Sequence, residues 1–264
     1  MKIKDWLSQA EKRLRDADIP SARLDAELVL SHSLGRNRTW LAAHADDEVF
    51  ASKSSEAEAH LAEREKRIPL AYLLGYKEFY GRRFTVTSDT LVPRPETETL
   101  VELVKKYELG GKVIDVGTGS GCLGLTIALE TDSELVLCDV SDVALEIAQK
   151  NATYLDVKNV VFMHSNLLLD VHEKFDLIAA NLPYVDRDWQ RSPETEHEPA
   201  LALFADDGGL ELIKKLIDQA PEHLNPGGHL LLEADPEQHQ AIVSYATAFD
   251  LVEAVDYAVL LKLR

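Results

Sequence analysis

The stretch Val113-Ile114-Asp115-Val116-Gly117-Thr118-Gly119-Ser120-Gly121 decides the fold of this 264-residue chain. An apolar run passes directly into a glycine-rich turn, and the residues from 123 to 129 that follow form a helical pattern. Glycine lets a ligand approach the backbone of the turn, and the N-terminus of the helix offers free N–H groups to an anion. The stretch therefore predicts a ligand site at the carboxyl end of a strand in an open α/β sheet.

Short apolar runs and helical patterns alternate along the chain after this turn. We expect further strands at residues 135–138, 160–163, 177–180 and 229–232, with helices over 143–154 and 210–220 among them. Continuous apolar strands between amphipathic helices indicate a parallel sheet that is covered on both faces. Two apolar segments, 251–255 and 258–263, are expected to close the sheet as an antiparallel pair. The predicted fold class is α/β, with a Rossmann-like and mostly parallel sheet.

The residues before the turn show a different pattern of apolar side chains. Apolar side chains recur at helical spacing from residue 3 to residue 65, with breaks near Pro20 and Gly35, which indicates a small bundle of helices. Aromatic and β-branched residues then flank Gly81, a pattern typical of a β-hairpin. We therefore divide the chain into a helical N-terminal domain at 1–75, a β-hairpin linker at 76–92 and the α/β domain at 93–264.

The charge of the chain is strongly uneven. The formal net charge is −18, yet residues 1–90 hold 15 basic and 15 acidic side chains, so the other 13 basic and 31 acidic side chains all lie in residues 91–264. An acidic surface repels phosphate backbones, so we expect no direct binding of nucleic acid. The one basic cluster comprises Arg64, Lys66, Arg67, Lys77, Arg82 and Arg83. A solvated surface explains this cluster at least as well as a docking site does.

Composition also indicates where in the cell the protein acts and whether it binds a metal. The chain has no apolar run of the length that a membrane span needs and no secretory leader at its start, so we expect a soluble, cytoplasmic protein without a membrane partner. Cys122 and Cys138 lie in apolar segments, without the spacing of a metal site or a disulfide framework. We therefore expect no metal and interpret both cysteines as buried apolar side chains.

A cofactor site is expected on the glycine turn. Asp139 ends the next strand, where its carboxylate can accept hydrogen bonds from both hydroxyl groups of a ribose. S-adenosylmethionine and NAD both require such an acid, and residues 119–124 formally satisfy the dinucleotide pattern G-x-G-x-x-G. The turn and Asp139 alone therefore leave a nicotinamide-dependent oxidoreductase open. That interpretation gives no role to the motif that follows the fourth strand.

Asn181-Leu182-Pro183-Tyr184 follows the fourth expected strand and so lies at the same edge of the sheet as the glycine turn. These residues suit methylation of an amide nitrogen, whose lone pair is delocalised. The Asn181 side-chain oxygen and the Leu182 carbonyl oxygen can each accept one hydrogen of the NH₂ group and aim its lone pair at a methyl donor. Pro183 holds Leu182 extended, and Tyr184 offers an aromatic face to a planar amide or base. Together the four residues favour a catalytic site over four separate structural roles.

These motifs resemble those of the bacterial release factor glutamine methyltransferases, and the resemblance covers nearly the whole chain. It rests on the glycine turn, the Asn181 motif and the stretches 23–30, 68–75, 78–81, 91–98, 198–201 and 207–210. The most specific of these is Leu91-Val92-Pro93-Arg94-Pro95-Glu96-Thr97-Glu98. The resemblance implies a class I methyltransferase fold, a helical N-terminal domain that docks the acceptor protein, and methyl transfer to the side-chain amide nitrogen (N5) of glutamine.

The resemblance also implies roles for individual residues. S-adenosylmethionine, which leaves as S-adenosylhomocysteine, would be held by Gly117, Thr118, Gly119, Ser120, Gly121, Asp139, Asn166, Leu167 and Asn181. The acceptor would be the glutamine of the Gly-Gly-Gln motif in class I peptide-chain release factors, held by Asn181, Leu182, Pro183 and Tyr184. We expect the enzyme to act as a monomer. The family normally has a proline where this chain has Leu182 and an aromatic residue near Leu167.

Three alternatives stay open at this point. Asn-Leu-Pro-Tyr also resembles the motif of ribosomal RNA adenine dimethylases, so adenine N6 of RNA or DNA is one candidate acceptor. A glutamine of a ribosomal protein would use the same residues as a release factor. A catalytically silent binding module could keep the fold, since Leu182 and Leu167 depart from the family pattern. The acidic α/β domain and the helical bundle argue against the nucleic-acid acceptor.

Overall fold

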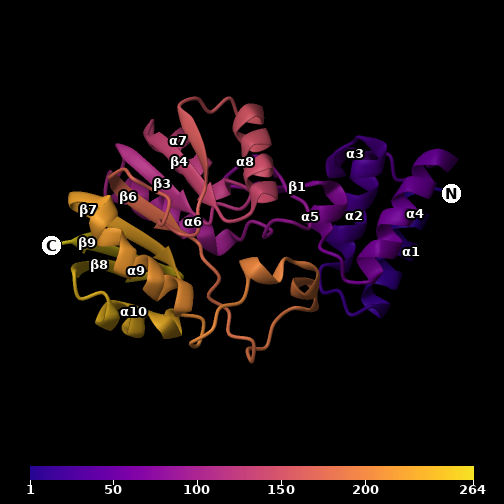
Figure 1. Ribbon diagram of the computed structural model, residues 1–264. Helices are drawn as coiled ribbons and strands as arrows, with labels where there is room; N and C mark the ends of the chain where they lie inside the picture. The colour runs from indigo at the N-terminus through magenta and orange to yellow at the C-terminus, as the bar shows by residue number, and fades with distance from the viewer. The chain divides into compact units, whose positions relative to one another are not determined.

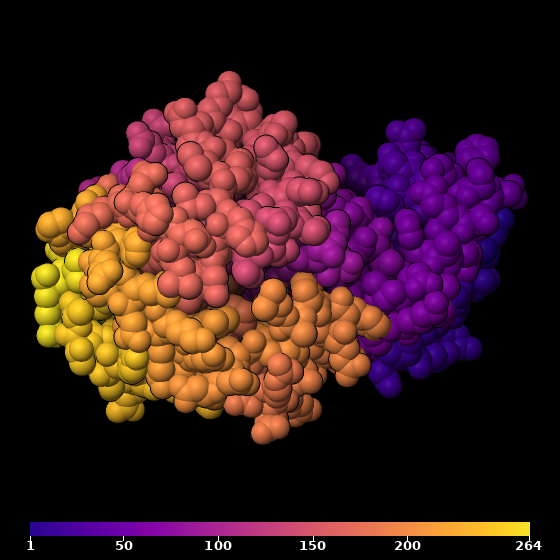
Figure 2. Space-filling view, viewed as in Figure 1, coloured from indigo at the N-terminus to yellow at the C-terminus, as the bar shows by residue number.

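The chain passes from one structural unit to another at Gly75, whose φ of 77° ends a helix in the left-handed conformation that glycine adopts without strain. The computed structural model describes residues 1–264. Unit 1 contains Met1–Gly75 together with Arg191–His197, and unit 2 contains Tyr76–Gln190 and Glu198–Arg264. Residues 1–75 are drawn in indigo to purple in Figure 1 and Figure 2. None of the helices is both long and apolar enough to cross a membrane.

Unit 1 is a bundle of helices around an apolar core, as the sequence predicts. Its helices are α1 (Ile3–Asp16), α2 (Ala22–Leu34), α3 (Arg38–Ala43), α4 (Ala51–Glu65) and α5 (Leu70–Leu74). Trp6 of α1 packs in one buried cluster with Leu30 of α2 and Leu61 of α4. Asn37 caps α3, because its side chain accepts a hydrogen bond from Trp40 N at 2.8 Å.

Unit 1 also includes a short segment from far along the chain, which no sequence pattern indicates. Glu194 lies in this segment and accepts hydrogen bonds from Arg64 Nη2 and Arg67 Nη2, each at 2.8 Å. Burial raises the pKa of Glu194, but hydrogen bonds from Ser192, Arg67 and Arg64 outweigh it and lower the pKa to about 2. Two members of the basic cluster therefore hold this segment, which interrupts the stretch 93–264 that the sequence assigns to one domain.

Unit 2 is built on a seven-stranded sheet in the order β5-β4-β3-β6-β7-β9-β8 (Figure 1). Its strands are β3 (Lys112–Val116), β4 (Glu134–Asp139), β5 (Val160–His164), β6 (Phe175–Ala180), β7 (Leu224–Glu233), β8 (Phe249–Val255) and β9 (Ala258–Leu263). Strands β3 to β7 run parallel, and β9 pairs antiparallel with both β7 and β8. The predicted fold class is confirmed, including the antiparallel pair at the end of the chain.

Helices cover both faces of this sheet. On one face lie α6 (Glu98–Lys106), α7 (Cys122–Thr131) and α8 (Asp142–Tyr154), and on the other lie α9 (Glu211–His223) and α10 (His239–Tyr245). Successive residues of a strand point to opposite faces. Val113 therefore packs into the core beneath α6, α7 and α8, and Ile114 packs into the core beneath α9 and α10. The hairpin of β1 (Tyr76–Phe79) and β2 (Arg82–Thr85) buries Phe79 and Phe84 in the core beneath α6, α7 and α8.

The order of the strands determines where a ligand can bind. From β3 the chain moves outward to β4 and β5 and then crosses back to β6 on the other side of β3. The loops after β3 and β6 therefore lead away in opposite directions and leave a crevice at the carboxyl edge of the sheet. The glycine turn follows β3 and the Asn181 motif follows β6, so the topology brings both motifs to this crevice.

Candidate functional site

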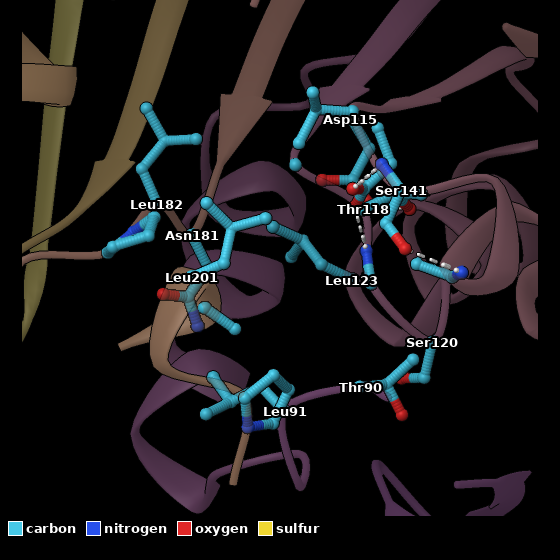
Figure 3. Close-up of a pocket in the computed structure, with 18 of the residues that line it drawn as sticks. Thr90, Leu91, Asp115, Thr118, Ser120, Leu123, Ser141, Asn181, Leu182 and Leu201 are labelled. Carbon is cyan, nitrogen blue, oxygen red and sulfur yellow. Dashed lines mark hydrogen bonds between the residues drawn. The ribbon is translucent and has the colours of Figure 1, made fainter. Parts of the chain in front are cut away.

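A pocket of about 540 Å³ opens at the carboxyl edge of the sheet, among the loops that follow β3, β4 and β6. Figure 3 shows Asn181 and Leu201 on one side of the pocket and Asp115, Thr118 and Ser141 on the other. All the residues that line it belong to unit 2. A cavity of this size has room for a nucleoside-based cofactor and an acceptor side chain.

The glycine turn has a backbone that glycine adopts more easily than any other residue. Gly117, Gly119 and Gly121 have φ values of 71°, 55° and 79°, all in the left-handed region. Gly117 N and Thr118 N both donate to Cys138 O, at 2.9 and 3.0 Å, which ties the turn to the end of β4. Gly121 is the N-terminal cap residue of α7 and does not line the pocket, whereas the four residues before it do.

Asp115 is a buried acid in the strand that leads into the turn, and it lines the pocket. Its Oδ2 accepts hydrogen bonds from Thr118 Oγ1 at 2.6 Å and from Gly124 N at 3.0 Å. Burial raises the pKa of Asp115 to about 6; the two hydrogen bonds oppose this rise, and the negative charge of Asp139 adds to it. Sequence reasoning missed this residue, because a single acid within an apolar strand carries no motif of its own.

Asp139 lies at the end of β4, and backbone donors hold both of its carboxylate oxygens. Oδ2 accepts from Gly119 N and Oδ1 accepts from Ser141 N, each at 2.9 Å. A carboxylate oxygen has two lone pairs, so each oxygen can accept a second hydrogen bond from a ligand in the pocket that Asp139 lines. Ser141 in turn caps α8 by accepting from Ala144 N at 3.3 Å. The carboxylate is therefore fixed in direction by the protein itself.

The segment after β5 forms a further wall of the pocket. Asn166 and Leu167 both line it. Leu167 is buried with a left-handed φ of 54°, and its carbonyl oxygen accepts from the Ser165 hydroxyl at 2.8 Å. With these two residues, the pocket brings together every residue that the family resemblance assigns to the cofactor except Gly121.

Asn181 lies just after β6 and lines the pocket across from the glycine turn (Figure 3). Its Nδ2 donates to Thr97 Oγ1 at 3.1 Å. Because Nδ2 is engaged, Oδ1 is the atom of this amide that is left to accept a hydrogen bond from a ligand. Leu182 and Pro183 line the pocket as well, and the Leu182 side chain is part of the core on the α9 face of the sheet.

Tyr184 does not line the pocket. Its ring packs against the core, its hydroxyl donates to Glu233 Oε1 at 3.0 Å, and its carbonyl oxygen accepts from Gln238 Nε2 at 2.9 Å. Burial and the nearby Glu233 carboxylate raise the pKa of Tyr184, so its hydroxyl keeps its proton at neutral pH. Contact between this ring and an acceptor amide stays a prediction, and the observed contacts add an anchoring role for its hydroxyl.

An ion pair that sequence reasoning did not connect fixes the rim of the pocket. Arg94 Nη2 lies 2.5 Å from Glu198 Oε1, and Val92 N donates to Glu198 Oε2 at 3.0 Å. The Glu198 side chain is buried, and the neighbouring Pro93 and Pro199 line the pocket. The motifs at 91–98 and 198–201 are therefore two halves of one structural feature.

Comparisons with known proteins show relatives of the whole chain and of its fold. Residues 5–75 match the family described as PrmC N-terminal domain, and residues 95–198 match the family described as Methyltransferase small domain. The release factor glutamine methyltransferase of Koribacter versatilis is 40% identical over 250 residues, which cover 89% of each chain. That of Deinococcus radiodurans is 40% identical over 246 residues, which cover 89% of this chain and 87% of its own. A solved methyltransferase from Pyrococcus furiosus has a similar fold, with a TM-score of 0.56 and 19% identity over 79% of this chain and 98% of its own.

Proposed function

The chain belongs to the release factor glutamine methyltransferase family, and we propose that it transfers a methyl group from S-adenosylmethionine to the side-chain amide nitrogen (N5) of the glutamine in the Gly-Gly-Gln motif of class I release factors. One observation carries the proposal. Thr97 engages Nδ2 of Asn181, so that Oδ1 is left to accept an amide N–H in the same pocket as the glycine turn and Asp139. S-adenosylhomocysteine is the second product.

The residues of the pocket fit this cofactor. Gly117 lines the pocket, and a Cβ atom there would lie 2.9 Å from Leu182 Cδ2, so a side chain at this point would clash with Leu182. Asp139 has two fixed oxygens, each with a lone pair to spare, as a ribose with two hydroxyl groups requires. The pocket is also lined by Asp89, Asp115 and Asp139, whereas its two cations, Arg94 and Lys215, are each paired with a glutamate, so the site suits a cationic ligand. The bound cofactor supplies an electrophilic methyl group on a sulfonium centre.

Two oxygens would hold the acceptor amide. Asn181 Oδ1 and the Leu182 carbonyl oxygen each accept one hydrogen of the NH₂ group, which localises the nitrogen lone pair and aims it at the methyl group. Pro183 disfavours the helical conformation of Leu182 and so fixes the direction of that carbonyl. The buried side chain of Leu182 anchors the same position in the core.

The acceptor nitrogen needs no dedicated base before it reacts. Once it is alkylated it carries a positive charge and is strongly acidic, so it releases one proton to water. The task of the protein is therefore to orient the amide and to keep the reacting atoms together, which are contributions that positioned groups make without proton transfer.

The other acceptors are not favoured. An exocyclic amine of a nucleobase would use the same two oxygens, but residues 91–264 carry the whole surplus of negative charge, which repels a phosphate backbone. A ribosomal-protein glutamine is also not favoured, because the curated relatives are named for release factors.

Transfer of a labelled methyl group from S-adenosylmethionine tests the proposal. The acceptors would be a purified class I release factor, the same factor with its Gly-Gly-Gln glutamine changed to alanine, and ribosomal RNA. We expect label on the intact factor alone. Equal label on both forms of the factor would exclude the glutamine as the acceptor, and label on RNA alone would assign the Asn181 motif to a nucleobase.

A further inference from the structure

Thr97 connects the acceptor motif to a buried acid. It lies at the start of α6 and is buried, and its backbone N donates to Arg94 O at 3.2 Å. Its hydroxyl oxygen accepts the hydrogen bond from Asn181 Nδ2 at 3.1 Å. The single hydrogen of that hydroxyl must therefore point elsewhere.

A buried acid, Glu233, lies near this hydroxyl. It is the last residue of β7 and is 1% exposed. Its Oε1 accepts the hydrogen bond from the Tyr184 hydroxyl, whereas its Oε2 is buried without a hydrogen-bond partner. The Thr97 hydroxyl lies close enough to Glu233 to lower the pKa of its carboxyl. Glu233 thus binds the Tyr184 hydroxyl through one oxygen and keeps the other unpaired near Thr97.

The chemistry of Glu233, Thr97 and Asn181 determines which group donates each hydrogen bond and which group accepts it. A carboxylate can only accept, so a hydroxyl beside it donates; the oxygen of that hydroxyl is then free to accept from Asn181 Nδ2. This order leaves Asn181 Oδ1 free to accept a hydrogen bond from a ligand in the pocket. If Thr97 instead donated to Asn181, the amide would turn its NH₂ group toward the pocket, and that group cannot accept a hydrogen from an incoming amide.

We propose that Thr97 and Glu233 are positioning residues, which hold the Asn181 amide with its oxygen toward the acceptor. The inference rests on the proposed function, in which Asn181 Oδ1 accepts a hydrogen of the acceptor amide. Glu233 touches neither the pocket nor the acceptor and acts through Thr97. Tyr184, which belongs to the same motif as Asn181, is held by Oε1 of the same carboxylate.

The charge state of Glu233 supports this arrangement. Burial raises the pKa of Glu233 to about 7, whereas the nearby hydroxyl groups of Thr97 and Tyr184 oppose this rise. The negative charge of Glu96 adds to the rise, and the positive charge of Arg94 opposes it. Other ionisable groups whose charge interactions involve Glu233 or its partner Tyr184 are Cys122 and Tyr257. Near neutral pH a protonated Glu233 could donate to Thr97, so we expect transfer activity to fall as pH falls through about 7.

The first test replaces the Thr97 hydroxyl by a methyl group of similar size. In Thr97→Val we expect kcat for methyl transfer to fall by about 10- to 100-fold, as for loss of a buried hydrogen-bond partner, with the dissociation constant of S-adenosylmethionine changed by about twofold at most. Thr97→Ser, which keeps the hydroxyl, should recover most of the lost activity. Thr99→Val, on the same helix, is the control and should match the wild type. Wild-type kcat in Thr97→Val, or equal losses in Val and Ser variants, would overturn the inference.

Glu233→Gln tests the acid separately and replaces the first test if Thr97→Val does not fold. A glutamine side chain can donate as well as accept, so it removes the fixed direction while keeping the size. We expect kcat to fall and the remaining activity to lose its decrease below pH 7. An unchanged pH profile in Glu233→Gln would show that Glu233 does not set the orientation of Asn181.

A readout that needs no acceptor separates this inference from the proposed function. In protein labelled with ¹⁵N-asparagine, the side-chain amide signal that disappears in Asn181→Ala belongs to Asn181. We expect one of its hydrogens to exchange with solvent at least about tenfold more slowly in the wild type and in Thr97→Ser than in Thr97→Val, because only the hydroxyl accepts it. Equal exchange in all three would overturn the positioning role. Slow exchange in the wild type together with no label on any release factor would instead reject the proposed function alone.

Discussion

Leu182 lies so close to Gly117 that a Cβ atom on the glycine would lie 2.9 Å from Leu182 Cδ2. The contact joins the turn after β3 to the motif after β6, which are the two parts of the pocket assigned to cofactor and acceptor. A side chain at Gly117 would therefore disturb both parts, and the left-handed φ of 71° would strain it in addition.

Gly117→Ala should consequently weaken binding of S-adenosylmethionine by about tenfold or more, because the clash with Leu182, added to a left-handed strain of roughly 1–2 kcal/mol, would shift the turn out of its cofactor-binding position. Isothermal titration calorimetry measures this loss. Gly81→Ala is a matched control: Gly81 has nearly the same φ, 72°, but a Cβ there would meet no atom within 4 Å. Equal cofactor affinity in the two variants would show that contact with Leu182 has no influence on the site.

The two sides of the pocket should separate in their effects. Asn181→Ala should lower kcat by about 10²–10³-fold, the range for loss of a positioned catalytic hydrogen-bonding group, while cofactor affinity changes little. Asp139→Ala should first weaken the cofactor, because it removes the carboxylate held toward the pocket by Gly119 N and Ser141 N. Calorimetry and single-turnover transfer distinguish the two results.

Asp142→Ala provides the control for Asp139→Ala. Asp142 lies three residues after Asp139 on the exposed surface, where its carboxylate contacts only His164. We expect wild-type affinity in this variant. If Asn181→Ala lost cofactor binding as strongly as activity, Asn181 would serve the cofactor, and its assignment to the acceptor would be wrong.

The main features of the fold could be predicted because they depend on local patterns. The apolar run at 113–116 and the glycines after it are adjacent in sequence, and the parallel topology then places the ends of β3 and β6 at one edge. The contact between Asn181 and Thr97 could not be predicted in this way, because 84 positions separate the two residues. Glu233 ends an apolar strand, and its neighbours in sequence do not indicate what its carboxylate contacts, so only the packed structure shows that it meets Tyr184. For the same reason, no pattern indicated that Glu194 would bind Arg64 and Arg67 in unit 1.

The ion pair of Arg94 and Glu198 should stabilise the rim of the pocket. Glu198→Ala leaves Val92 N and the Arg94 guanidinium without their acceptor, so we expect the free energy of unfolding to fall by about 1–3 kcal/mol. Glu198→Gln keeps an acceptor for Val92 N and should lose less. Urea denaturation measures both changes. Glu196→Gln is the control, since Glu196 is exposed only two residues away. A loss in the control as large as that in Glu198→Ala would contradict a specific role for the ion pair.

Stability should also depend on pH through Glu233. Its pKa is about 7 in the folded protein against an ordinary value of 4.5, because burial disfavours the charged form. Between these two values the folded state binds more protons than the unfolded state, so the contribution of Glu233 to the free energy of unfolding decreases as pH rises through this window. Below about pH 4.5 the penalty is absent, and above about pH 7 it is complete and of the order of 3 kcal/mol.

Glu233→Gln removes the titration and should flatten this part of the pH dependence. Urea denaturation at pH 5 and pH 8 would show wild type losing stability relative to Glu233→Gln on going to the higher pH, whatever the absolute difference at pH 5. The comparison between variants isolates Glu233 from Asp115, whose raised pKa of about 6 acts in the same direction in both proteins. Glu237→Gln, which changes a nearby exposed acid, should follow the wild type. Parallel stability curves for wild type and Glu233→Gln would mean that Glu233 titrates alike in the folded and unfolded states. Burial would then not raise the pKa of Glu233, which would contradict this prediction.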